Sequence, residues 1–144
     1  MKNMVLLIDT NVLLDYILFR QPQYKNSFRV ISACMKDGVK GYVAFHSLSS
    51  MWYMLRKKPE SERRRVLSEL TDFLTVVAAP HEEVVNAIRD ENFPDFEDCL
   101  QEKCALAVNA DFIVTNNVKD FKSSKIPAVT PAEIIENFCR TETR

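Results

Sequence analysis

The sequence has 144 residues, of which 47% are hydrophobic, a net charge of -1, and only two glycines and six prolines. These values fit one globular domain with a sizeable core, and they exclude a disordered chain, a low-complexity chain and a repeat array. The near-neutral charge provides no global attraction to nucleic acid, so any such binding would need a local basic patch.

The elements expected from the sequence alternate between short apolar runs and segments with helical spacing of apolar residues. In chain order they are a strand from Val5 to Ile8, helices from Thr10 to Leu18 and from Tyr24 to Asp37, a strand from Tyr42 to Phe45, a helix capped by Ser47 and running to about Lys57, a helix from Ser61 to Leu70, a strand from Leu74 to Val77, a helix from Glu82 to Asp90, a helix capped by Asp95 and running to about Val108, strands from Phe112 to Val114 and from Ala128 to Val129, and a last helix from Pro131. This alternation predicts an α/β fold: a three-layer α/β/α sandwich with a mainly parallel five-stranded sheet, in a single domain over residues 1–144.

The apolar run at the N-terminus, Met4 to Ile8, is too short for a signal sequence or a membrane span because Asp9 closes it. We therefore expect a cytoplasmic protein without a membrane segment. The four cysteines show no C-x-x-C pairing and no zinc-ligand spacing with the two histidines. We expect reduced thiols that are mostly packed in the core.

Acidic and polar side chains follow the expected strands at the ends where ligands collect in parallel α/β folds. Asp9 comes directly after the first strand, and the fourth strand is followed by Thr115, Asn117 and Asp120. Helices in such folds run back against the strands, so their first turns should reach the same edge. The further residues expected there are Asn11, Asp15, Ser50, Asp95 and Asp98.

Several carboxylates in one region repel each other, and a divalent cation commonly neutralises such a group. The ligands available here are oxygens, without His or Cys, which favours Mg²⁺ or Mn²⁺ over zinc. Such a cation suits the hydrolysis of a phosphodiester by metal-activated water.

Each acid also has a purely structural interpretation. Asp9 can cap the helix from Thr10, and the D-x-x-D step of Asp95 and Asp98 resembles a capping box at a helix N-terminus. Asp120 can be an ordinary loop acid, and Asp15, one turn along the first helix, a surface charge. On the residues alone both interpretations stay open.

A local basic patch lies between Arg56 and Arg65, where six of ten residues are basic. Arg63 and Arg64 in this patch are candidates for binding the RNA backbone. Lys119, beside Asp120 in the sequence, is a third candidate. The alternative is a solvated turn between two helices, in which the first basic residues complement a helix C-terminus.

Three strings together resemble the PIN-domain family in order and spacing: IDTNVLLD from Ile8 to Asp15, DFED from Asp95 to Asp98 and TNNVKDF from Thr115 to Phe121. The resemblance extends from Val5 to the IPAVTP segment ending at Pro131. It implies a three-layer α/β/α nuclease domain and a Mg²⁺- or Mn²⁺-dependent ribonuclease, most often the toxin of a bacterial toxin-antitoxin pair. RNA would be the substrate, and an antitoxin protein or a second copy of the chain are candidate partners.

The resemblance assigns roles to residues of this chain. Asp9, Asp98 and Asp120 match the first, third and fourth metal-binding acids and are the candidate catalytic residues, while Asn11, Thr115 and Asn117 match supporting polar positions. The second acid aligns with Ser50, which carries no charge, and Asp95 is the candidate that compensates for it. The alternative is therefore a degenerate PIN domain that binds RNA or protein and cleaves weakly or not at all.

Two other enzyme and signalling classes fit less well. A haloacid-dehalogenase-like phosphatase requires a second Asp two residues after the first, and this chain has Asn11 at that position after Asp9. A receiver-type signalling domain wants paired acids early in the chain, and that pair is absent from the sequence.

Overall fold

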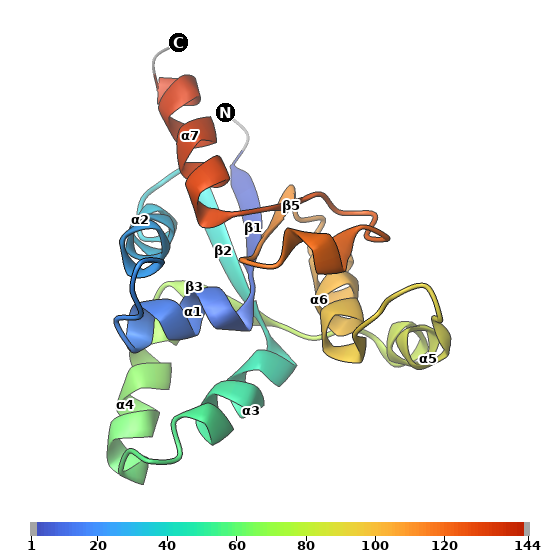
Figure 1. Cartoon of the computed structure of the whole chain (residues 1–144), viewed down its shortest axis with the longest axis horizontal. Coiled ribbons are helices and arrows are strands. Elements are labelled where there is room, and N and C mark those ends of the chain that lie inside the picture. Colours follow the sequence, from blue (N-terminus) through green and yellow to red (C-terminus); the bar gives the residue numbers. More distant parts are fainter. Residues whose placement is uncertain (1–2, 143–144) are drawn as a thin grey trace.

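A sheet of five parallel strands forms the centre of the molecule, with the order β3-β2-β1-β4-β5 (Figure 1). The computed structural model describes residues 3–142, with side chains up to Arg140. The strands are β1 (Met4–Ile8), β2 (Val39–Ala44), β3 (Leu74–Val77), β4 (Phe112–Val114) and β5 (Ala128–Val129). The predicted α/β fold with a parallel five-stranded sheet is confirmed.

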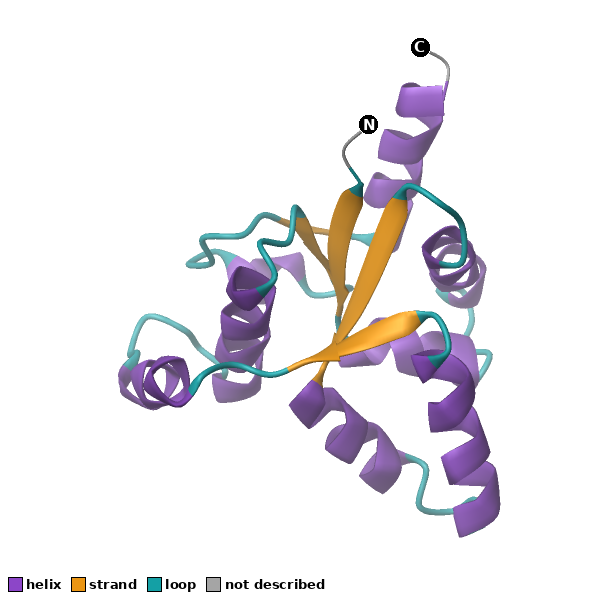
Figure 2. Ribbon diagram, turned by 180° about the vertical axis from the view of Figure 1, so that it is seen from behind, coloured by secondary structure: helices purple, strands orange, loops and turns teal. Residues whose placement is uncertain are grey.

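Helices cover both faces of this sheet, which gives the three layers (Figure 2). One face packs against α1 (Thr10–Ile17), α2 (Tyr24–Cys34), α3 (Phe45–Met54), α4 (Glu60–Thr71) and α7 (Pro131–Glu142). The other face packs against α5 (His81–Arg89), α6 (Phe96–Ala107) and the short 3-10 helix η1 (Val118–Phe121).

The central strand β1 shows why its sequence does not alternate between polar and apolar residues. Leu6 and Ile8 pack into the core on one face, Leu7 packs into the core on the other, and all three are 0% exposed. A strand covered on both faces needs apolar side chains in both directions. The first polar residue, Asp9, therefore marks the edge where β1 leaves the core.

The start of α3 differs from the expected one. The strand β2 ends at Ala44, which is the N-cap, and α3 begins at Phe45, so Ser47 lies inside the helix and is 0% exposed. Ser47 was a false capping signal because its hydroxyl serves a tertiary contact instead. The shift also places Ser50 in the second turn of α3, and the expectation of a first-turn position is wrong.

More of the surface of the helix α6 is buried than the single apolar face that is typical of an amphipathic helix. Glu102 is 2% exposed although it is charged, and its Oε2 accepts a hydrogen bond from the backbone N of Lys125 at 2.7 Å. Its other oxygen lies 3.3 Å from the Nζ of Lys103. The segment between η1 and β5 covers this face of the helix, which periodicity within α6 cannot reveal.

Two smaller expectations can be compared with the structure. No helix within residues 3–142 is long and apolar enough to cross a bilayer. Cys34, Cys99 and Cys104 are buried and form no disulfide, while Cys139 is exposed. Burial raises the pKa of the Cys34 thiol to about 12, and the prediction of packed thiols is confirmed for these three.

Candidate active site

Asp9 lies where the central strand ends, and it is 5% exposed. Its Oδ1 accepts a hydrogen bond from the backbone N of Thr10 at 2.8 Å, so it does cap α1. Its Oδ2 accepts another from the hydroxyl of Thr115, just after β4, at 2.8 Å. Burial raises the pKa of Asp9, these two hydrogen bonds lower it, and the charges of Asp120 and Asp95 raise it again. The capping interpretation of Asp9 is therefore confirmed, and the same carboxylate lies within reach of the charges of Asp120 and Asp95.

Asp95 and Asp98 approach this edge from the start of α6. Asp95 is the N-cap of the helix and accepts a hydrogen bond from the backbone N of Asp98 at 3.0 Å, which confirms its capping role. The carboxylate of Asp98 is half-buried, and burial raises its pKa to about 7, helped by the charges of Asp9, Asp95, Asp120 and Glu97. Each of these charges must therefore lie within electrostatic reach of Asp98.

Asp120 completes the group from the first turn of η1. It raises the pKa of both Asp9 and Asp98. The structure thus brings the four predicted acids together from β1, α6 and η1. Among the Asp, Glu, His and Cys side chains that the structure describes, no three are arranged so that they could hold a metal ion without moving.

The supporting polar residues differ in their burial and in their hydrogen-bond partners. Thr115 is 0% exposed and binds Asp9, and its hydroxyl also accepts a hydrogen bond from the backbone N of Asn117 at 3.0 Å. Asn11 is exposed in the first turn of α1. The hydroxyl of Ser50 is 3.3 Å from the backbone O of His46, to which it donates within its own helix.

Asp15 corrects a sequence interpretation, because it is 5% exposed and not a surface charge. Its Oδ2 accepts a hydrogen bond from the Nδ2 of Asn116 at 2.7 Å, and its Oδ1 lies 3.6 Å from Arg20. Asp15 therefore ties α1 to the loop after β4, which also carries Thr115.

Two residues beside the acids were not predicted from the sequence. Burial lowers the pKa of His46, in the first turn of α3, and the charge of Glu97 opposes that shift, so the starts of α3 and α6 face each other. The Nε2 of His46 and the Oε1 of Gln101 are buried without a hydrogen-bond partner in the described part of the chain. In the sequence, only the position of His46 directly after a strand pointed to this edge.

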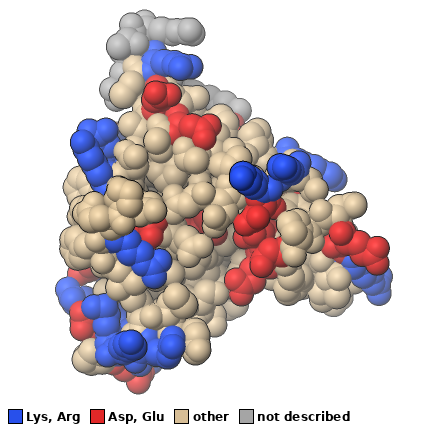
Figure 3. All heavy atoms as spheres, in the orientation of Figure 1, with Lys and Arg blue, Asp and Glu red and all other residues tan. Residues whose placement is uncertain are grey.

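The basic residues between Arg56 and Arg65 gather over the turn between α3 and α4, apart from the acidic patch near α6 (Figure 3). Arg63 stacks on the ring of Trp52 at 4.2 Å, while Arg64 lies 2.8 Å from Glu60 and Arg65 lies 3.5 Å from Glu69. Arg56 donates to the backbone O of Tyr53 at 3.2 Å, as the helix C-terminus interpretation expects. Lys119, the remaining candidate, is exposed on η1.

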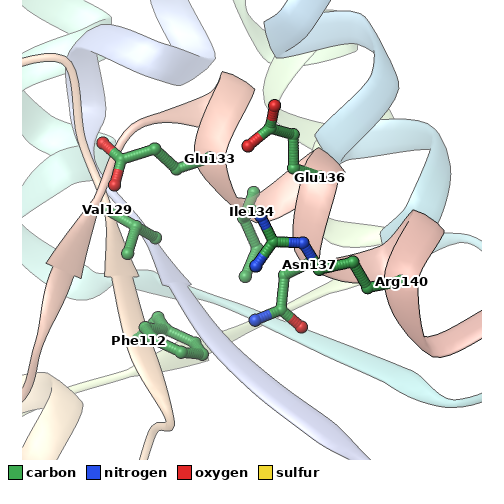
Figure 4. A pocket seen from close by; sticks show the side chains of 7 residues that line it. All are labelled: Phe112, Val129, Glu133, Ile134, Glu136, Asn137 and Arg140. Carbon is green, nitrogen blue, oxygen red and sulfur yellow. The ribbon is translucent and has the colours of Figure 1, made fainter.

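Two of the hollows lie beside α7, away from the acids. One has a volume of about 260 Å³ and lies beside α7, between side chains such as Phe112, Glu133 and Arg140 (Figure 4). A wider groove of about 960 Å³ lies between α2, α7 and the start of β1. Neither contains one of the four acids, so the chemistry of the donor groups, and not the shape of the surface, identifies the candidate site.

Comparison with known proteins identifies the family and the fold. The PIN domain family model matches residues 5–119. Ribonuclease VapC1 of Aquifex aeolicus (strain VF5) is 26% identical over 135 residues, which cover 91% of this chain and 93% of the relative.

Solved structures share the fold at low sequence identity. VapBC-1 from nontypeable Haemophilus influenzae matches with a TM-score of 0.66 at 19% identity, over 90% of this chain and 99% of that one. VapBC2 from Rickettsia felis, bound to a DNA fragment from its promoter, matches with a TM-score of 0.64 at 18% identity, over 88% and 98% of the two chains. Since the family model spans most of the sequence, this chain belongs to the PIN domain family.

Proposed function

We propose that this protein is a divalent-metal-dependent ribonuclease, with Asp9, Asp98 and Asp120 as its catalytic acids. The observation that carries the proposal is the crowding of these carboxylates with Asp95, which helps raise the pKa of Asp98 to about 7. Proteins keep such a group of like charges where a cation neutralises it or where catalysis uses it. The similarity to a relative named as a ribonuclease supports the same reaction.

The donor set fits a hard cation. Asp9, Asp98 and Asp120 would hold Mg²⁺ or Mn²⁺ through carboxylate oxygens, with Asp95 beside them. When bound, such a cation activates water and stabilises the negative charge that develops on the phosphate oxygens. The charges of Asp95 and Asp120 raise the pKa of both Asp9 and Asp98, which supports a site shared by these carboxylates.

Hydrogen bonds within the protein fix the positions of the candidate catalytic groups. Thr115 and the backbone N of Thr10 hold both oxygens of Asp9, each at 2.8 Å, so this buried carboxylate has a defined orientation. Asp95 holds the first turn of α6 through the backbone N of Asp98. Because burial raises the pKa of Asp98 to about 7, this carboxyl holds its proton more tightly than usual, and cation binding would favour release of that proton.

A second candidate function is a binding module with weak or absent cleavage. The observation that favours it is Ser50, which stands where the family resemblance places an acid and whose hydroxyl bonds to its own helix. Fewer charged ligands hold a divalent cation more weakly.

The solved structures with the same fold include VapBC2, VapBC-1 and a toxin-antitoxin complex from Klebsiella pneumoniae. On that similarity we infer that this chain is the toxin of such a pair and that an antitoxin protein is its partner. Co-purification with the product of an adjacent small reading frame would test this.

The proposed reaction is tested by incubating the purified protein with single-stranded and structured RNAs in Mn²⁺ or in chelator. We expect cleavage in Mn²⁺ only, and its loss in Asp9→Asn. Asp72→Asn, at the exposed end of α4, is the matched control and should cleave as the unchanged protein does. Mn²⁺ should also raise the Tm of the unchanged protein through preferential binding to the folded state, and this shift should disappear in Asp9→Asn. Metal-bound protein that cuts no RNA would favour the binding module.

A further inference from the structure

A buried polar contact joins the three helices whose first turns lie nearest to the acids. Gln101 of α6 is 2% exposed, and its Nε2 donates to the hydroxyl of Ser47 on α3 at 2.8 Å. The same nitrogen lies 3.4 Å from the hydroxyl of Thr10 on α1. Thr10 in turn donates to Ser47 at 2.7 Å. One side chain from each helix therefore meets the other two at a single place.

Each member of this contact is close in sequence to a position of the acidic site. Thr10 follows Asp9 and donates its backbone N to the Asp9 carboxylate at 2.8 Å. Gln101 lies about one turn after Asp98 on α6, and Ser47 about one turn before Ser50 on α3. The contact thus connects the three backbone segments that carry Asp9, Ser50 and Asp98.

This contact includes a feature that lowers the stability of the folded state. The Oε1 of Gln101 is buried and has no hydrogen-bond partner among the residues that the structure describes. A buried polar atom without a partner destabilises the folded state, and an apolar side chain of similar length would avoid that penalty. The hydrogen bonds of Gln101 to Ser47 and Thr10 are therefore made together with a buried oxygen that has no partner among the described residues.

We infer that Gln101 is a positioning residue, which through Ser47 and Thr10 fixes the start of α6, and so Asp98, relative to Asp9. The inference rests on the proposed metal-dependent cleavage. The repulsion among Asp9, Asp95, Asp98 and Asp120 tends to push their segments apart, and a neutral hydrogen-bonded contact opposes this without adding charge. Small displacements of such groups are expensive for catalysis, because the reacting geometry must be held in advance.

The test is Gln101→Met, which keeps the length and the buried volume but removes the hydrogen bonds. We expect an unchanged or higher Tm, since the unpartnered oxygen is gone. At saturating Mn²⁺ the kcat on a single-stranded RNA should fall about tenfold, with an unchanged KM for RNA and a higher half-saturating Mn²⁺ concentration. Gln23→Met, at an exposed position before α2, is the matched control and should change none of these values.

A second variant keeps the test decisive if Gln101→Met does not fold. Ser47→Ala removes the shared hydroxyl and should lower kcat similarly, and the double variant should lose little more than either single one, because the residues act as one unit. An unchanged kcat and Mn²⁺ dependence in a folded Gln101→Met or Ser47→Ala would overturn the inference. A loss of activity that only follows the folded fraction would also overturn it.

Failure of the proposed function is distinguishable from failure of this inference. If the unchanged protein cuts no RNA, the proposed function fails, and calorimetry with Mn²⁺ alone then tests the positioning role. Weaker Mn²⁺ binding by Gln101→Met would support it, and equal binding would overturn it. Absence of Mn²⁺ binding by the unchanged protein would overturn both.

Discussion

The hydroxyl of Thr115, at the end of β4, donates a hydrogen bond of 2.8 Å to the carboxylate of Asp9, at the end of β1. Because burial raises the pKa of Asp9 and this hydrogen bond lowers it, Thr115 helps to keep a buried carboxylate ionised. The same hydroxyl accepts the backbone N of Asn117 and thereby also orders the loop that leads to Asp120.

Thr115→Val should therefore weaken both the fold and the site. Valine fills the same volume but leaves the Asp9 oxygen and the Asn117 nitrogen without this partner, which costs about 1 to 3 kcal/mol of unfolding free energy. Mn²⁺ binding at neutral pH should weaken because Asp9 ionises less readily. Urea denaturation and calorimetry measure the two effects, and Thr115→Ser, which keeps the hydroxyl, is the control. Equal Mn²⁺ affinity in the Val and Ser variants would contradict this role.

The raised pKa of Asp98 predicts how stability depends on pH in the absence of metal. The pKa is about 7 in the folded protein, above the value of about 3.9 expected in the unfolded chain, so the folded state holds the proton more tightly. The resulting stabilisation is fully present below about pH 4 and is lost as the pH rises through 7. Other carboxylates titrate near the lower limit, so the window that reports on Asp98 is about pH 5.5 to 8.5.

Asp98→Asn removes this titration. In chelator the variant should show a flatter dependence of Tm on pH between 5.5 and 8.5, and a higher Tm than the unchanged protein at pH 8. Asp37→Asn, at an exposed position after α2, provides the comparison. A parallel decline of Tm with pH in the Asp98→Asn variant would show that this carboxyl is not the group that titrates.

Ser50→Glu tests whether an acid can be restored at the position where the resemblance expects one. A further carboxylate should tighten Mn²⁺ binding and raise cleavage at limiting metal, because affinity depends on the charge of the ligands. Support from the helix dipole is smaller than a first-turn position would give, since Ser50 lies in the second turn. The exposed neighbour allows Ser49→Glu as the control for added charge alone. Equal effects of both substitutions would mean that Ser50 does not face the acids.

The basic patch between Arg56 and Arg65 gives a prediction about salt. Arg64 and Arg65 pair with exposed glutamates, and such surface pairs are weak enough to exchange for phosphate. Replacing Arg63, Arg64 and Arg65 by Gln should reduce the salt dependence of RNA binding by a slope of about 0.7 for each phosphate that the protein no longer neutralises. The comparison is the same replacement at Lys25, Arg29 and Lys36, which are exposed on and after α2. If both triple variants keep the original slope, the patch serves only the fold.

The strands, and the edge of the sheet at which they end, were predictable from the sequence because both depend on residues that are neighbours along the chain. An apolar run closed by Asp9 and a second one closed by Thr115 must end on the same side of a parallel sheet. Ser47, Glu102 and Asp15 were not predictable in this way, since their environments are set by segments distant in the chain. Ser47 is hydrogen-bonded to Thr10 and Gln101, Glu102 to Lys125, and Asp15 to Asn116.

The central place of β1 in the strand order has a consequence for synthesis on the ribosome. The strands β1, β2 and β3 emerge first and form one half of the sheet, whereas β4 and β5 must later add to the free side of β1. A nascent chain that has reached Val77 contains Asp9 but none of the other three acids, which lie beyond Phe93. The acidic site is therefore complete only after α6 and η1 have joined the first half of the sheet.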